Sequence, residues 1–429
     1  MERYSEYKDS GVKWLGEIPS HWEVKRLGSF FFERKEKVSD KDYAPLSVTK
    51  QGIFPQLENV AKTNDGDNRK LVKEGDFVIN SRSDRKGSSG VSGLDGSVSL
   101  INIVLQPRKV LFGPFCNYLL KSYGFIEENY RNGRGIVADL WTTRYDEMKM
   151  IKVAMPSFEE QKNISSYLDA ATSKIDKAIA MQQKMIDLLN ERKQIIIQNA
   201  VTKGLDENVE MKDSNCKFLG KIPSTWEVCK TLYVLSMPIT DGPHTTPQLY
   251  DDGIPFVSAE AVSCGNGYID FSHIRGYISD SFYNECCKKY IPQRDDIYMI
   301  KSGATTGKVA IVNTDVKFTI WSPLAVFRVN KKKVLPYFLY YSLQSSYYQL
   351  QVQDKWSFGT QQNIGMRMLE KLILCYPSIE EQAKIVAFIK KNVDNFDSAI
   401  SNSQRQIALL QERKQIIINE VVTGKVKVS

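Results

Sequence analysis

The strongest constraint on the fold is a repeat inside the chain. The seven residues Glu191–Ile197 occur again, letter for letter, at Glu412–Ile418, an offset of 221 residues. A second pair of segments, Asp9–Val24 and Asp213–Val228, is identical at 11 of 16 positions at an offset of 204. A repeat of about 200 residues is far longer than the ~20–50 residues of solenoid repeats. The sequence therefore predicts a duplicated domain, in which each copy has a constant opening segment, a variable middle and a constant closing segment.

The closing segments carry the periodicity of long helices. In both copies apolar residues recur at steps of three, four and seven, which keeps them on one helix face. Two stripes with the same spacing favour two helices that pair with each other, and packing of each helix on its own domain is the alternative. The stripe widens at Ile195, so a third surface, either the chain's own domain or another subunit, is expected to cover it. The residues expected to pair the helices or dock a partner are Ile164, Leu168, Ile175, Ile179, Leu189, Ile196, Ile385, Ile389, Phe396, Ile400, Leu410 and Ile417.

Composition narrows the class of protein. The chain has 429 residues, enough for several domains, and 58 basic against 50 acidic residues, a balance that permits nucleic-acid binding without requiring it. Seven scattered cysteines without a Cys-x-x-Cys pair indicate a reducing compartment, and with only three histidines no metal site is expected. No stretch approaches the ~20 apolar residues of a membrane span. We therefore expect a cytoplasmic protein with no membrane association.

The variable middles share a scaffold and differ in their loops. Strands are predicted at 76–79 and 296–300, and short helices at 114–122 and 336–344. Loops that mix cations with small residues follow both strands, and Asp241–Pro247 forms a further, stiffer loop. Arginine can pair with guanine and lysine can neutralise phosphate, so these loops are candidate DNA contacts, although solvated surface loops would look the same. The candidates are Lys50, Gln51, Arg82, Arg85, Lys86, His244, Thr245, Thr246, Lys301 and Lys308.

Two apparent catalytic motifs are incomplete. Gly303–Val309 is like a phosphate loop but has three residues between its glycines and ends on Val309 in place of Ser or Thr. Asp139, Glu147 and Lys149 are like the acid–acid–lysine set of a metal-dependent nuclease. The second copy has Thr360, Met368 and Glu370 at these places, which favours coincidence. We predict no catalytic residue and no metal ligand, and a binding function.

The constant segments resemble those of a known family. Leu-Gly-x-Ile-Pro-Ser-x-Trp stands at 15–22 and 219–226, Pro-Ser followed by Glu-Gln at 156–161 and 377–382, and the shared heptapeptide ends both helices. The segments 241–244, 253–256 and 359–363 of the second middle are also typical. The layout resembles the specificity (S) subunits of type I restriction–modification systems. The first middle lacks the Asp-Gly-x-His loop, so the two halves are expected to read different sequences.

The resemblance implies a fold and a set of domains. The fold is mixed α/β (α+β), with two globular target-recognition domains separated by two long antiparallel coiled-coil helices in a pseudo-twofold, circular arrangement. Residues 1–156 would form the first target-recognition domain with its opening segment, and 157–200 the first spacer helix. Residues 201–377 would hold a linker, the second opening segment and the second target-recognition domain. Residues 378–429 would form the second spacer helix and the C-terminal tail.

The resemblance also implies a function. This chain would be the non-catalytic subunit that reads a split sequence in double-stranded DNA and directs adenine methylation and restriction by its partners. The partners would be DNA methyltransferase subunits, two of them expected, and restriction/translocase subunits. S-adenosylmethionine, ATP and magnesium would belong to those partners, and none to this chain. Two alternatives are a free-standing bipartite DNA-binding regulator without enzyme partners and a nuclease that uses Glu147 and Lys149.

Overall fold

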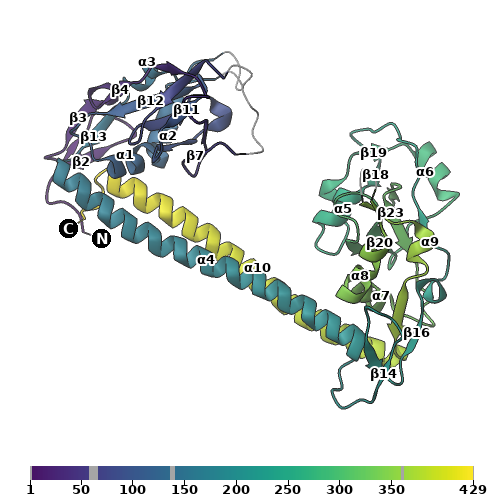
Figure 1. Ribbon diagram of the computed structural model, residues 1–429. Coiled ribbons are helices and arrows are strands. Elements are labelled where there is room, and N and C mark those ends of the chain that lie inside the picture. The colour runs from purple at the N-terminus through teal and green to yellow at the C-terminus, as the bar shows by residue number, and fades with distance from the viewer. Residues whose placement is uncertain (1, 58–65, 136–140, 359–361, 429) are drawn as a thin grey trace. The chain divides into compact units, whose positions relative to one another are not determined.

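The chain folds into two compact units. The computed structural model describes residues 2–57, 66–135, 141–358 and 362–428 (Figure 1). Unit 1 combines Met1–Gln183 with Gln404–Ser429, and unit 2 is Lys184–Ser403. Each unit holds one mixed α/β domain together with the beginning of one long helix and the end of the other. The expected fold class, two globular domains joined by two long helices, is confirmed.

Unit 1 is built on two small antiparallel sheets. One has the order β10-β9-β12-β4 and the other β11-β8-β5. The strands of unit 1 are β1 (Tyr7–Asp9), β2 (Glu17–Pro19), β3 (Glu23–Arg26), β4 (Phe31–Glu33), β5 (Lys37–Val38), β6 (Leu46–Val48), β7 (Ile53–Pro55), β8 (Arg69–Val72), β9 (Phe77–Asn80), β10 (Ser89–Val91), β11 (Gly96–Val98), β12 (Asn102–Pro107) and β13 (Lys152–Met155). The short helices are α1 (Gly113–Leu120), α2 (Tyr123–Arg131) and α3 (Tyr145–Met148).

Unit 2 has an antiparallel sheet of order β17-β23-β20-β21 and a second sheet of order β19-β18-β22, in which β18 and β22 are parallel. Its strands are β14 (Met211–Asp213), β15 (Lys221–Pro223), β16 (Glu227–Lys230), β17 (Thr240–Asp241), β18 (Ile254–Val257), β19 (Tyr277–Ile278), β20 (Ile297–Ile300), β21 (Val309–Ile311), β22 (Thr319–Ile320), β23 (Leu324–Phe327), β24 (Ser357–Phe358), β25 (Gln362–Asn363) and β26 (Ile373–Tyr376). Its short helices are α5 (Ala259–Cys264), α6 (Asp280–Cys287), α7 (Pro336–Gln344), α8 (Ser346–Lys355) and α9 (Met366–Leu369).

The central strand of each unit is buried on both faces. In β9, Phe77 and Ile79 enter the main core, while Val78 between them enters a smaller cluster. In β20, Ile297 and Met299 enter the main core, and Tyr298 enters the second cluster. Side chains alternate across a strand, so an unbroken apolar run serves two cores at once. The predicted strands and the matching short helices α1 and α7 are confirmed.

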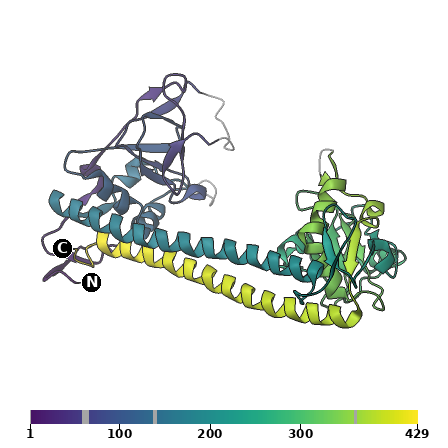
Figure 2. The ribbon, with the colours of Figure 1, turned by 60° about the horizontal axis from the view of Figure 1, so that its bottom comes forward.

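The two long helices are continuous. Helix α4 (Phe158–Lys203) has 46 residues and helix α10 (Ile379–Val422) has 44. Within each unit they lie side by side, and in unit 1 the beginning of α4 lies beside the end of α10 (Figure 2). Lys414 Nζ contacts Asp176 Oδ1 at 2.7 Å in unit 1, and Lys193 Nζ contacts Asp397 Oδ1 at 2.7 Å in unit 2. The two ion pairs are equivalent at the offset of 221, so the helices meet in the same way in both units.

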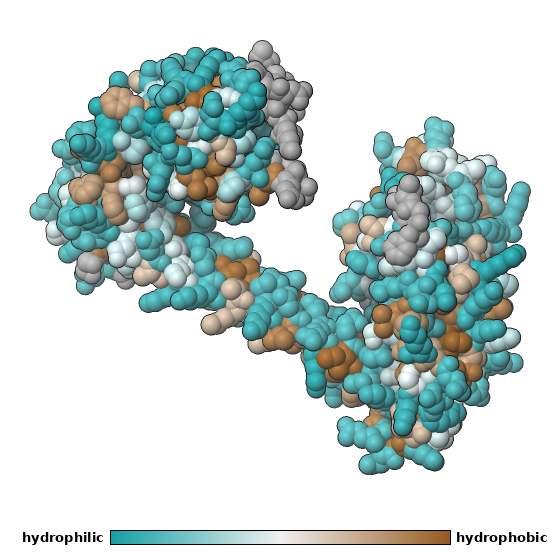
Figure 3. All heavy atoms as spheres, in the orientation of Figure 1, coloured by the Kyte–Doolittle hydropathy of each residue, from teal (hydrophilic) through white to brown (hydrophobic). Residues whose placement is uncertain are grey.

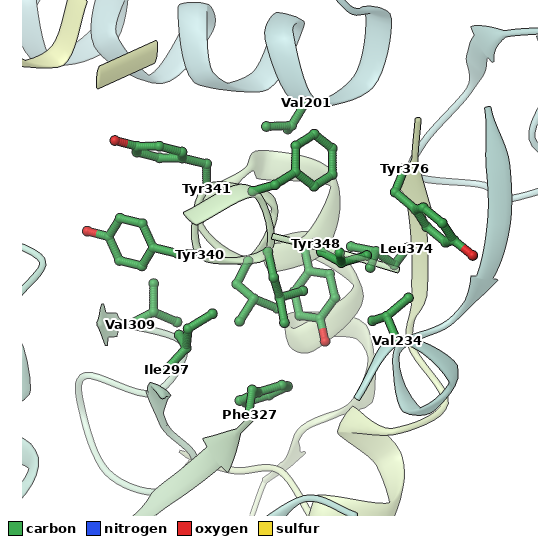
Figure 4. Close-up of a cluster of buried hydrophobic side chains, with 14 of the residues drawn as sticks. Val201, Val234, Ile297, Val309, Phe327, Tyr340, Tyr341, Tyr348, Leu374 and Tyr376 are labelled. Atoms are coloured by element: carbon green, nitrogen blue, oxygen red, sulfur yellow. The ribbon is translucent and has the colours of Figure 1, made fainter. Parts of the chain in front are cut away.

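The apolar stripe serves both the domains and the helix pair. Ile164, Leu168 and Ile175 lie in the unit 1 core beside Ile417 from the other helix, and the unit 2 core takes in Ile385, Ile389 and the end of α4. Figure 4 shows Val201 pointing from α4 toward the cluster around Tyr341 and Tyr348. The other predicted seam residues are half-buried: Ile179, Leu189, Ile196, Phe396, Ile400 and Leu410. Each helix therefore packs on its own domain at its beginning and against the second domain at its end.

The constant segments lock the ends of the helices to the domains. Trp22 Nε1 donates to Glu160 Oε1 at 3.0 Å in unit 1, and Trp226 Nε1 donates to Glu381 Oε1 at 3.1 Å in unit 2. The glycine that ends the other helix packs against each tryptophan in a left-handed conformation, with φ of +75° at Gly424. A Cβ at Gly424 would lie 2.4 Å from Pro19 Cδ. The predicted circular arrangement, in which each helix ends against the opening segment of the other copy, is confirmed.

Candidate nucleic-acid interface

The basic loop of unit 1 lies between β9 and β10. Its backbone is held from the side, because Ser83 N donates to Trp141 O at 3.0 Å. Arg82 and Arg85 are exposed, and Arg85 Nε lies 3.6 Å from Oδ2 of the neighbouring Asp84. Lys86 is held by Glu127 at 2.7 Å and lies 4.4 Å from the centre of the Tyr130 ring. The loop therefore presents two arginines to solvent and keeps its lysine in an internal contact.

The equivalent loop of unit 2 joins β20 to β21. It is tied down in a related way, since Gly303 N donates to Gln362 O at 3.0 Å. A strand follows this loop, whereas a phosphate loop requires a helix N-terminus at that place. Gly303–Val309 therefore lacks the strand–loop–helix setting of a phosphate loop. Of the segment 359–363, residues 359–361 lie outside the described residues.

A buried carboxylate organises the basic groups of unit 2. Asp241 is 1% exposed, and its oxygens lie 2.5 Å from Lys289 Nζ, 3.1 Å from His244 Nε2 and 3.4 Å from Lys301 Nζ. Burial alone would raise the pKa of Asp241. The Lys289 hydrogen bond and the nearby positive charges outweigh burial and lower the pKa below its usual value. One negative charge thus holds up to three cations beside the exposed Thr245 and Thr246.

The structure changes the role of one candidate and adds another. Lys301 has a side chain only 13% exposed and faces Asp241, so it positions the loop and does not extend from it. Lys289, just after α6, was not predicted. It lies 48 residues from Asp241 in sequence, and no spacing rule connects a lysine after one helix to an aspartate on a distant strand.

Three further candidates lie at cavities beside the long helices. Lys50 and Gln51 form the turn between β6 and β7 and line a cavity of about 690 Å³ beside the long helices of unit 1. Lys308 lines a cavity of about 680 Å³ beside the long helices of unit 2. The candidates therefore fall into two groups in each unit, one on a loop of the domain and one at the junction with the helices.

The nuclease-like residues do not converge. Glu147 accepts from Arg144 N at 3.2 Å and pairs with Arg134 at 3.3 Å, while Lys149 pairs with Asp146 at 2.6 Å. Asp139 lies outside the described residues. Over residues 2–57, 66–135, 141–358 and 362–428 no group of three His, Cys, Asp or Glu side chains could hold a metal ion. Glu147 and Lys149 thus cap and brace the short helix α3.

Two further observations concern the helices and the cysteines. In the part of the chain that the structure describes, no helix combines the length and the apolar character needed to cross a membrane. All seven cysteines are free thiols.

Comparison with known proteins gives matches in sequence and in fold. Residues 245–411 match the sequence model of the type I restriction modification DNA specificity domain. Over 441 residues, which cover 98% of this chain and 97% of the relative, the chain is 25% identical to the type I restriction enzyme MjaVIII specificity subunit of Methanocaldococcus jannaschii. A chain from a solved structure on complex assembly and conformational transition of the type I R-M system aligns with a TM-score of 0.69 at 16% identity, covering 95% of this chain and 99% of that one. The HsdS subunit from Thermoanaerobacter tengcongensis aligns with a TM-score of 0.51 at 16% identity, covering 97% of this chain and 100% of that one.

These matches define the class of protein. At 16% identity the two solved structures establish the fold alone, and the sequence matches supply the kind of protein that carries it. The relative matched over almost the whole chain is a specificity subunit of a type I restriction enzyme. The resemblance predicted from the opening segments and the helix ends is confirmed: this chain is similar to such a subunit over almost its whole length, and residues 245–411 match the DNA specificity domain.

Proposed function

We propose that this chain is a non-catalytic subunit that reads a split sequence in double-stranded DNA and directs partner enzymes to it. Unit 1 reads one half-site through the loop with Arg82 and Arg85. Unit 2 reads the other through the loop that Asp241 organises. The long helices, which pass from one unit into the other, set the gap between the half-sites. The partners methylate adenine and cleave unmodified DNA.

One observation carries the proposal, the contrast between a repeated frame and unlike loops. The tryptophan–glutamate lock and the lysine–aspartate pair between the helices recur in both units at matching positions. The groups offered to a ligand differ. Unit 1 has two exposed arginines, and unit 2 has Asp241 with the basic groups around it, which we name the Asp241 centre. A frame that is kept while its loops diverge is what two different ligands of one chemical kind require.

A repeated apolar surface on the helices favours the proposal that two partner subunits dock on this chain. Leu188 and its counterpart Leu409 are each 50% exposed. Ile195 and its counterpart Ile416 are 41% and 48% exposed. Figure 3 shows brown, apolar surface interrupting the teal surface of the helices. Exposed leucine and isoleucine at matching places favour docking of the same partner twice, so we assign this surface to two modification subunits and argue against a free-standing regulator.

The cofactors follow from this division of labour. S-adenosylmethionine would be held by the modification subunits, and ATP and magnesium by the restriction/translocase subunits. This chain recognises the DNA sequence, and the whole complex is expected to act in the cytoplasm.

Mapping methylated adenines tests the proposal. The chain is expressed with its modification subunits in a host that lacks adenine methylation, and methylated positions are read across the genome. We expect one split sequence with a fixed gap. Methylation without a common sequence, or one continuous sequence, contradicts the proposal, and a chain that binds DNA but assembles with no modification subunit favours the regulator.

A further inference from the structure

Each unit contains a cavity where its domain meets the two long helices, which we name the junction cleft. The junction cleft of unit 1 has a volume of about 690 Å³ and is lined from α10 by Gln411, Lys414, Gln415 and Ile418. That of unit 2 has a volume of about 680 Å³ and is lined from α4 by Asn190, Lys193, Gln194 and Ile197. The two sets stand at equivalent positions at the offset of 221. The clefts are therefore part of the repeated frame.

Lysines outnumber acids in both junction clefts. Among the described lining residues, unit 1 has Lys50, Lys121 and Lys414 against Asp176. Unit 2 has Lys193, Lys308 and Lys390 against Asp394 and Asp397. Both clefts thus keep a net positive charge.

The lysines of unit 1 crowd one another. Burial and the charge of Lys414 lower the pKa of Lys121. Lys121 Nζ donates to the backbone oxygen of Gln51 at 3.3 Å. A bound anion would relieve this repulsion, and amide side chains such as Gln411 and Gln415 can donate hydrogen bonds to its oxygens.

The junction clefts lie on the opposite side of the helices from the exposed apolar surface. At about 100° per residue, Lys193 and Ile197 stand roughly 140–180° around the helix from Leu188 and Ile195. The same holds for Lys414 and Ile418 relative to Leu409 and Ile416, because the spacing is identical. One side of each helix is therefore suited to an apolar protein partner, and the other side to a polar, anionic ligand.

We propose that each junction cleft binds backbone phosphates of the DNA next to the half-site that its own unit reads. This inference rests on the proposed function. It gives a long helix a direct part in DNA binding, through Lys390 of α10, that is independent of sequence. Lysine neutralises phosphate without distinguishing bases. The clefts therefore add affinity, and the loops recognise the bases of the target.

Salt dependence of DNA binding tests the inference. The variants are Lys50→Gln with Lys121→Gln in unit 1 and Lys308→Gln with Lys390→Gln in unit 2; Lys193 and Lys414 are spared because they join the helices. Lys174→Gln and Lys384→Gln, exposed lysines of the helices outside the clefts, are the controls. The complex with modification subunits is titrated with its target duplex and with an unrelated duplex. Each lost phosphate contact should make the slope of log affinity against log salt less steep by about 0.9. The ratio of wild-type to variant affinity should therefore fall about threefold per contact between about 50 and 200 mM salt.

An equal loss of affinity for both duplexes, with an unchanged target sequence, supports the phosphate contacts. Duplexes with neutral methylphosphonate linkages beside one half-site should weaken wild type but not the matching double variant. An unchanged slope in folded variants overturns the inference. So does weaker assembly with modification subunits at constant slope, which would make the clefts protein-docking surfaces. If wild type binds no split target at all, the proposed function fails, and that result is read from the wild-type titration alone.

Discussion

The frames of unit 1 and unit 2 are held by equivalent contacts, whereas their loops differ. Gln161 accepts from Phe112 N at 2.9 Å, and its counterpart Gln382 accepts from Leu335 N at 2.7 Å. Leu27 N donates to Ile151 O and Thr231 N donates to Leu372 O, each at 2.8 Å. Between these closing bonds, the loops offer Arg82 and Arg85 in one unit and the Asp241 centre in the other.

The difference separates two kinds of residue. Some residues that repeat letter for letter, such as Trp22 and Trp226, are buried and fix the frame. Others, such as Leu188 and Ile195, repeat and stay exposed on the helices, where we propose that partners dock. The residues proposed to read DNA lie in the loops, where the copies disagree.

The largest expected effect comes from breaking the frame. Trp22→Ala and Trp226→Ala should each cost about 3–5 kcal/mol of unfolding free energy, because each removes a buried indole and its hydrogen bond to a glutamate at the start of a long helix. Chemical denaturation of the purified chain measures the cost. Tyr233→Ala, at an exposed side chain, is the control and should cost little. A large loss for one tryptophan only would show that the two frames are not equivalent.

The next effect sharpens the contrast at Asp241. Asp241→Asn should weaken binding to the unit 2 half-site by about 2 kcal/mol, because the cations lose the charge that holds them. The unit 1 half-site should bind as before, which competition between duplexes altered in one half measures. Equal losses at both half-sites would mean that Asp241 supports the whole chain.

The charge of Asp241 also predicts a dependence on pH. Because its pKa is lowered in the folded protein, its contribution to stability is present above the ordinary aspartate pKa and is lost as pH falls through the lowered value. The stability difference between wild type and Asp241→Asn should therefore be constant near neutral pH and shrink under acid conditions. Denaturation curves at several pH values measure it, and a difference that grows toward acid would have the wrong sign.

The arginines of unit 1 give the reciprocal test. Arg82→Ala and Arg85→Ala should each relax discrimination by about 1–3 kcal/mol at positions of the unit 1 half-site only. His244→Ala and Thr245→Ala are the matched variants and should affect the other half alone. Binding to a library of duplexes randomised in one half at a time separates the two outcomes. Relaxation in both halves from a single variant would contradict independent reading.

The smallest effect concerns the helix pair. Lys193→Gln and Lys414→Gln should each cost about 0.5–1 kcal/mol, since each breaks one partly exposed ion pair. The two costs should agree because the pairs are equivalent, and double-mutant cycles with Asp397→Asn and Asp176→Asn measure the pairwise part. A coupling near zero in one unit only would show that the helices meet differently in the two units.

The sequence predicted the frame well because the frame is local and repeated. The helices, the strands at Phe77 and Ile297 and the closure at Gly204 and Gly424 follow from periodicity, turn residues and duplication. The Asp241 centre could be predicted only in part. His244 is close in sequence, but Lys289 and Lys301 reach Asp241 through the folding of β20 and α6.

The junction clefts were beyond sequence reasoning for the same reason. Lys50 and Lys414 come together only because the turn between β6 and β7 lies beside α10. Neither periodicity nor motif spacing connects residues so far apart along the chain. The apolar excess at Ile195 was visible in the sequence, yet only the structure shows that Ile197 is covered by the domain while Ile195 stays exposed.

An exchange of variable middles tests the central claim most directly. The segment Thr231–Leu372 replaces Leu27–Ile151, so the equivalent closing bonds at both boundaries can re-form, and methylated adenines are mapped in cells that carry the chimera and its modification subunits. We predict a split target in which the unit 2 half-site appears in both halves. A folded, active chimera that still methylates the original target, or reads a new sequence in both halves, would contradict a shared frame with independent reading units.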